Sequence, residues 1–198
     1  MKLNGQNIVI FGLPRMDSEI ESTNYTTAKL LAKTNRVFYV ENPFTLKDYF
    51  KFRNLKQGKI RRGYFSLFNT KLVDTDTPGL SIIIPPVLLS INFLPEGLLF
   101  RSALRINEYL LAFKVKRFLS KYKISNFIYI NSFNFHYPGL ADYLKPVLEV
   151  YHCLDPLVVD FDRKHGMVSE DMIIRRSDVV ICSSRKLYND KKLLNEFS

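Results

Sequence analysis

The sequence is poor in the residues that build metal centres and disulfide frameworks. It contains two cysteines, Cys153 and Cys182, and three histidines, and none of them is spaced like a zinc ligand set. Both cysteines lie within apolar segments, which favours reduced, buried thiols over a disulfide bond. We therefore expect a protein that uses neither a metal ion nor a disulfide.

Long apolar runs are also missing. The longest one, residues 80–98, is interrupted by Pro85, Pro86 and Pro95. It falls short of the roughly 20 unbroken apolar residues that a membrane span needs. The start of the chain, Met1–Gln6, is polar and does not resemble a signal peptide. The sequence thus predicts a cytoplasmic protein with no segment across the bilayer.

Three glycine-containing signatures of nucleotide and acyl chemistry are absent: the P-loop, the GxSxG elbow and GxGxxG. Gly12 does follow the first apolar run, but Pro14 removes a backbone donor from its loop. Glu41 ends the second apolar run, where dinucleotide enzymes carry a ribose-binding acid. A nucleotide- or dinucleotide-binding oxidoreductase or epimerase is therefore the alternative function. Gly12 could equally be a tight turn and nothing more.

Acidic residues are scarce beside basic ones, and the formal net charge is +10. Between Lys47 and Arg62 seven basic residues accompany one acid, Asp48, and aromatic residues interleave with them. We call residues 44–68 the basic flap. It could be a solvated surface, a nucleic-acid surface, or a segment that lies on an anionic membrane. Because no nucleic-acid-binding signature is present, we expect membrane contact rather than nucleic acid. The predicted membrane contacts are Lys51, Arg53, Lys56, Lys59, Arg61 and Arg62.

Six short apolar runs alternate with helical patterns, which is typical of an α/β protein with a parallel sheet. The predicted strands are Asn7–Phe11, Arg36–Val40, Leu80–Ile84, Asn126–Ile130, Leu148–Cys153 and Val179–Cys182. The predicted helices are Ser22–Lys33, Phe100–Tyr122, Phe135–Leu144, one capped by Ser169 and ending at Arg176, and Arg185–Glu196. Right-handed crossovers favour a Rossmann-like, doubly wound sheet of strand order 3-2-1-4-5-6, with helices on both faces. We expect residues 1–198 to form one domain.

In this strand order the winding reverses between the first and fourth strands, so a crevice opens beyond their carboxyl ends. Its predicted floor is made of Gly12–Arg15, Asn131 with Ser132, His152–Asp155, and Ser183 with Ser184. Asp155 and His152 are candidate acid–base or hydroxyl-binding groups. His152 could equally be an interior histidine, and two serines opening a helix are more typical of a cap than of a nucleophile. His136 and His165 have the pattern of ordinary loop residues.

The order and spacing of six segments resemble the N-terminal half of GT-B glycosyltransferases. These segments are NIVIFGLPR, RVFYVENP, LSIIIPP, FIYINS, LEVYHCLDP and RSDVVICSSRKL. The chain is most similar in kind to family 4-like enzymes of teichuronic acid and exopolysaccharide synthesis. The resemblance implies an acceptor-binding half, with the C-terminal donor-binding domain missing from this chain. It implies that the fragment alone is inactive as an enzyme.

The resemblance also implies partners and site residues. The whole enzyme would move a sugar from a nucleotide-diphosphate donor to a glycan or lipid-linked acceptor, without a further cofactor. It would sit at the inner face of the plasma membrane. Asn131, His152 and Asp155 would be catalytic, and Gly12, Leu13, Arg15, Ser132 and Ser183 would contact substrate. The chain departs from many relatives where Asn131 and Ser132 follow the fourth strand, since those relatives carry a histidine there.

Overall fold

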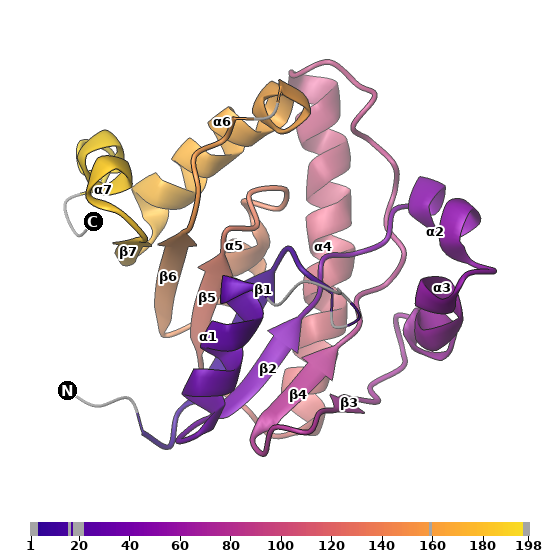
Figure 1. Cartoon of the computed structure of the whole chain (residues 1–198). Helices are drawn as coiled ribbons and strands as arrows, with labels where there is room; N and C mark the ends of the chain where they lie inside the picture. The colour runs from indigo at the N-terminus through magenta and orange to yellow at the C-terminus, as the bar shows by residue number, and fades with distance from the viewer. Residues whose placement is uncertain (1–3, 16, 18–21, 159, 196–198) are drawn as a thin grey trace.

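The computed structural model describes residues 4–15, 17, 22–158 and 160–195. Seven strands in this part of the chain form one sheet, in the order β3-β4-β2-β1-β5-β6-β7 (Figure 1). The strands are β1 (Asn7–Gly12), β2 (Arg36–Val40), β3 (Val73–Asp74), β4 (Leu80–Ile83), β5 (Ile128–Ser132), β6 (Leu148–Cys153) and β7 (Val179–Cys182). Six of them are parallel and follow the predicted order. The seventh, β3, is a two-residue antiparallel edge strand that the sequence did not predict.

Both faces of the sheet centre are buried, which explains the unbroken apolar runs in the sequence. In β1 the side chains of Ile8 to Phe11 are completely covered. Ile8 and Ile10 pack on one face, with α1 (Thr23–Ala32), whereas Val9 and Phe11 pack on the other face. That second face is covered by α4 (Leu98–Lys121) and α5 (Leu140–Leu144).

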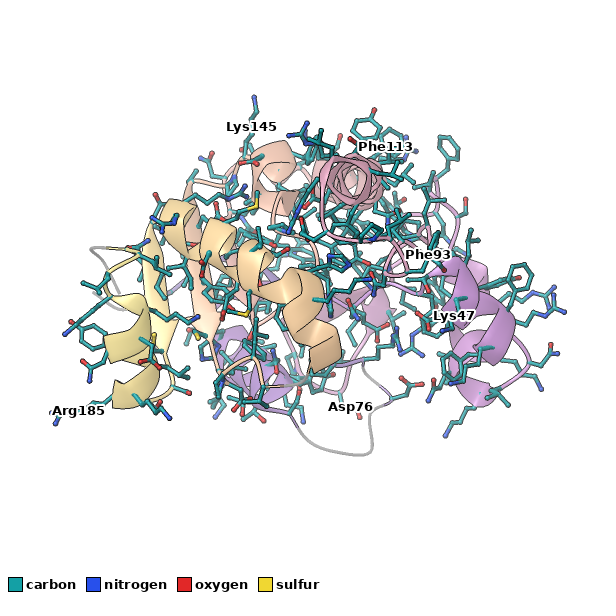
Figure 2. The ribbon with its side chains drawn as sticks, turned by 90° about the horizontal axis from the view of Figure 1, so that it is seen from above. Lys47, Asp76, Phe93, Phe113, Lys145 and Arg185 are labelled. Carbon is teal, nitrogen blue, oxygen red and sulfur yellow. The ribbon has the colours of Figure 1, made fainter. Side chains whose placement is uncertain are left out.

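The remaining helices flank this core. Helix α6 (Asp160–Arg176) lies on the α4 side and packs against β6 and β7, and α7 (Arg185–Lys191) follows β7 (Figure 1). The basic flap forms α2 (Leu46–Phe52), α3 (Lys56–Arg61) and the short 3₁₀ helix η1 (Arg62–Tyr64). Viewed from above the strand ends, α1 lies on one side of the sheet and α4 on the other (Figure 2). The helices therefore cover both faces, as predicted.

Four element predictions need correction. Helix α5 begins at Leu140, so residues 135–139 are a loop with turns and not part of the predicted helix Phe135–Leu144. Strand β5 ends at Ser132 and not at Ile130, so Asn131 and Ser132 lie inside the sheet and not in a loop. Helix α6 begins at Asp160, and Ser169 is an interior residue rather than its cap. The last helix ends at Lys191, and its predicted end at Glu196 lies outside the described residues. In the described ranges, no helix is both long and apolar enough to cross a bilayer.

Candidate functional site

A pocket of about 560 Å³ lies at the carboxyl edge of the sheet. Asn42 and Pro43, which follow β2, form one wall, and residues 135–137, which follow β5, form another. The remaining walls of the pocket come from three segments: the connection that leads to α4, the first turns of α4, and residues 165–169 of α6. Because β2 and β5 lie on either side of β1, the pocket opens where the winding of the sheet reverses. The pocket thus lies at the edge of the sheet where the predicted strand order placed a crevice.

The pocket wall mixes aromatic rings with polar side chains that can form hydrogen bonds. The rings belong to Phe93, Phe100, Phe135 and Tyr137, and the polar groups belong to Asn42, Ser90, Asn92, Asn107, His136, His165 and Ser169. The charged side chains on the wall are Lys47, Asp48 and Lys51, all from α2. Phe93 and Lys47 lie on the same side of the molecule, near the flap (Figure 2). The wall suits a ligand with hydroxyl groups and an apolar face.

Asn107 shapes this wall from α4. Its side chain is 1% exposed, and its amide exchanges two hydrogen bonds with the backbone of Leu89, at 2.9 and 3.0 Å. These bonds fix the connection that runs from β4 to α4. On the opposite wall the Thr45 and Asp48 side chains form a capping box that starts α2. Two pocket walls are thus held by side-chain bonds to the backbone.

The side chain of His165 is held in the wall by two contacts, with Phe100 and with Glu96. Its ring stacks on Phe100 with 3.6 Å between centroids and 9° between planes. Its Nδ1 lies 2.7 Å from Glu96 Oε2, and Arg101 holds the same carboxylate at 2.6 and 2.9 Å. Sequence reasoning missed both His165 and His136, because a single histidine beside a polar segment carries no signal until its neighbours are known.

The structure brings three predicted floor residues together. Gly12, Ser132 and His152 are register partners at the ends of β1, β5 and β6. Ser132 Oγ accepts a hydrogen bond from Asn24 Nδ2 at 3.0 Å and lies 3.3 Å from His152 Nδ1. Burial lowers the pKa of His152. A neutral His152 that accepts from the Ser132 hydroxyl fits this arrangement, which lies on the α1 side and outside the pocket wall.

Asn131 has a different position from the one predicted. Its side chain is 2% exposed and bonds both the N–H and the carbonyl of Asn134, at 2.8 and 3.1 Å. Asn134 in turn donates to the Gly12 carbonyl and to Asn42 Oδ1. The expectation that Asn131 faces the crevice is wrong, because its buried amide holds Asn134, which in turn bonds the end of β1 and the residue Asn42 beyond β2.

Gly12 does not offer an open phosphate-binding turn. A Cβ atom at this position would lie 2.2 Å from the hydroxyl of Tyr39, whose Oη donates to the Pro14 carbonyl at 3.0 Å. The neighbouring Arg15 bonds the carbonyls of Asn42 and Pro43 and stacks on Phe44 at 4.3 Å. Burial lowers the pKa of Arg15. Arg15 thus holds the backbone of Asn42 and Pro43, two residues of the pocket wall.

The other predicted substrate contacts are scattered. Leu13 is half-buried against the cluster between β6, β7 and α6. The Ser183 hydroxyl donates to the Leu154 carbonyl, and its N–H donates to the Cys153 carbonyl at 3.0 Å, so it joins the ends of β6 and β7. Asp155 is exposed just beyond β6. The pocket wall contains none of these three residues.

Arg61 is the one predicted membrane contact that the structure contradicts. Its side chain is 1% exposed, and it donates to both oxygens of Glu41 at 2.8 and 3.0 Å and to both oxygens of Asp17 at 2.5 and 2.9 Å. Burial alone would lower the Arg61 pKa, but the bonds and charges of these two acids raise it above its usual value. Arg61 thus ties α3 to the sheet. The other five predicted contacts are exposed.

Comparison with known proteins adds no identification. No protein-family model matches the chain, and no curated protein sequence matches it significantly. Across the residues that the structure describes, no group of three or more histidine, cysteine, aspartate or glutamate side chains is arranged to hold a metal ion.

Proposed function

We propose that this chain is the acceptor-binding half of a GT-B glycosyltransferase, whose acceptor occupies the pocket between the ends of β2 and β5. The whole enzyme would transfer a sugar from a nucleotide-diphosphate donor to a hydroxyl of a glycan or lipid-linked acceptor. The observation that carries the proposal is the position and lining of the pocket. It lies at the switch point of the sheet, where α/β proteins of this topology bind ligands.

The composition of the wall supports a sugar in particular. A pyranose presents hydroxyls around its rim and an apolar C–H face, and the wall pairs amide, hydroxyl and imidazole groups with aromatic rings. A volume of about 560 Å³ falls within the usual range of small-molecule sites. Exposed Asp155, beyond β6 at the same edge, is the acid–base group that we propose for the transfer step.

Two contacts argue against the dinucleotide-binding alternative. Both carboxylate oxygens of Glu41 are bonded to Arg61, so this acid is not free to bind a ribose. The space that a glycine would leave for a diphosphate is filled at Gly12 by the hydroxyl of Tyr39. The features that suggested this alternative in the sequence have structural roles instead.

The surroundings of the pocket support contact with an anionic membrane. Phe93, Leu98 and Leu99 are 78%, 90% and 67% exposed, and they belong to the connection and helix end beside the pocket. Lys47 and Lys51 lie on the facing wall. Exposed apolar side chains next to cations are suited to a bilayer interface, where each basic residue contributes on the order of 1 kcal/mol. We propose peripheral binding at the inner face of the plasma membrane, which would present a lipid-linked acceptor to the pocket.

The test of the transfer reaction uses protein expressed from the complete reading frame. We would incubate it with a panel of radiolabelled nucleotide-diphosphate sugars and polyprenyl-linked acceptors, and measure label in the lipid fraction. Transfer that requires one donor and one acceptor is the expected result. Saturable binding of NAD or NADP at micromolar concentration, with no transfer from any donor, would favour the alternative.

A separate experiment tests the membrane proposal. Charge reversal at Lys51, Arg53, Lys56 and Lys59 should abolish flotation with anionic vesicles at low salt. The matched control reverses four exposed lysines outside the flap, namely Lys33, Lys116, Lys123 and Lys145. Both variants change the net charge equally, so equal loss of flotation in the two would refute a specific role of the flap.

A further inference from the structure

His165 and Glu96 form a carboxylate–imidazole pair beside the pocket that the proposed function has not used. Glu96 precedes α4, His165 lies in α6, and 69 residues separate them in sequence. Arg101 bonds both oxygens of Glu96, and it also donates to the Ser169 hydroxyl at 2.9 Å. The pair is therefore fixed between two helices, and Phe100 sets the plane of the imidazole ring.

The contacts define which ring nitrogen carries the proton. Burial opposes ionisation of Glu96, but the hydrogen bonds from Arg101 and His165 and the charge of Arg101 hold its pKa below the usual value. An ionised carboxylate only accepts, so the nitrogen that faces it, Nδ1, must be the donor. In neutral His165 this leaves Nε2 as an acceptor with a free lone pair.

Nε2 of His165 is buried and has no hydrogen-bond partner among the described residues. A buried polar atom without a partner destabilises the folded state, so such atoms are few in folded proteins and each needs an explanation. His165 is also part of the pocket wall, next to Gly166 and Ser169. Because Nε2 is covered in the structure, a ligand hydroxyl would reach it only after a small movement of the pocket wall, and such a hydroxyl would be the donor that this acceptor lacks.

We propose that His165 Nε2 accepts a hydrogen bond from a hydroxyl of a pyranoside in the pocket, with Glu96 as the residue that positions the imidazole. The inference rests on the proposed function for its ligand class, a sugar. It goes beyond that function because it assigns the recognition of one hydroxyl to a residue pair from α6 and the α4 connection. Arg101 acts through Glu96 and does not touch the ligand.

The first experiment needs no substitution. We would label histidine with ¹⁵N in the intact chain and read the tautomer of each imidazole from its nitrogen resonances. The expected result is a neutral His165 that is protonated at Nδ1. Titration with a panel of methyl pyranosides (gluco, galacto, manno and N-acetylglucosaminide) should then move the His165 Nε2 resonance in a saturable way. The resonances of His152, which lies outside the pocket wall, are the internal control.

Two substitutions separate the ring nitrogens. His165→Asn keeps a donor near the Nδ1 position and removes Nε2, whereas His165→Gln places an amide near the Nε2 position. We expect His165→Asn to weaken the binding of the active pyranoside at least tenfold, and His165→Gln to weaken it less. Glu96→Ala should shift His165 toward the Nε2-protonated tautomer, a spectroscopic change that a purely structural role of Glu96 would not produce.

The outcomes distinguish this inference from the proposed function. If a pyranoside perturbs other pocket residues, but neither moves Nε2 nor binds more weakly to His165→Asn, the inference is refuted and the acceptor pocket stands. An Nε2-protonated tautomer in the wild type would also refute it. If no pyranoside binds at tens of millimolar, the inference fails, and the transfer assay described above decides the proposed function independently.

Discussion

Arg61 and Arg62 are adjacent arginines with opposite environments, and they provide the sharpest test of how the basic flap is attached. Arg61 is 1% exposed and bonds Glu41 and Asp17, whereas Arg62 is exposed. Truncation of Arg61 to alanine removes the cation to which both oxygens of Glu41, itself 1% exposed, are hydrogen-bonded. Breaking a buried pair in this way costs about 3–5 kcal/mol, whereas removing an exposed cation costs at most about 0.5 kcal/mol.

The assay is urea unfolding followed by far-UV circular dichroism, because the chain contains no tryptophan for fluorescence. For a chain of this size about 3–5 kcal/mol also corresponds to a fall in melting temperature of roughly 6–20 °C. Combining Arg61→Met with Glu41→Gln should recover about 1–3 kcal/mol relative to Arg61→Met alone, because the double variant also removes the buried negative charge of Glu41. Equal losses of stability in Arg61→Ala and Arg62→Ala would refute the buried ion pair.

Three further perturbations follow from buried groups. Burial lowers the pKa of Lys114 to about 8, so the folded chain releases this proton at a lower pH than the unfolded chain does. The stability of the wild type should therefore rise between pH 8 and about 10.5, and Lys114→Met should reduce this rise, measured as the midpoint of urea unfolding at each pH. Burial raises the pKa of Glu108 to about 7, so this residue should lower stability by up to about 3 kcal/mol between pH 4.5 and 7; Glu108→Gln should remove that share of the fall and leave the share of Glu149, whose pKa burial also raises to about 7. Gly12→Ala should cost about 1–3 kcal/mol by thermal unfolding because its Cβ would meet Tyr39, while Gly63→Ala, which has open space, should be neutral.

The strands were predictable because their signal is local. Ile8 to Phe11 form an apolar run that reads as a strand buried on both faces, and the structure covers all four side chains. The alternation of such runs with helical patterns is sufficient to predict a parallel sheet and its order. The order then implies which strand ends meet, and Gly12, Ser132 and His152 are indeed register partners.

The errors arose where a polar residue is satisfied by a partner far away in sequence. Ser132 was placed in a loop because it is polar, but its hydroxyl bonds Asn24, 108 residues earlier, inside the fold. Arg61 was grouped with its exposed neighbours because charge counts do not show which cation is paired. A signal was present in Glu41, since an acid at the end of a buried strand requires a partner.

The pocket lining was not predicted for the same reason. His165 gains its environment from Glu96, Phe100 and Arg101, which are more than 60 residues away. No local pattern distinguishes such a histidine from one in an ordinary loop. The strand order therefore predicted the edge of the sheet at which the pocket lies, but not the side chains that line it.

A matched pair of tryptophan substitutions tests whether an acceptor occupies the pocket between β2 and β5. Asn92 is exposed on the pocket rim, and Asn126 is exposed just before β5, at the opposite edge of the sheet. In protein from the complete reading frame, Asn92→Trp should lower kcat/KM for the acceptor at least tenfold and leave the KM for the donor unchanged. Asn126→Trp should retain wild-type values. Wild-type acceptor kinetics in Asn92→Trp would contradict the account.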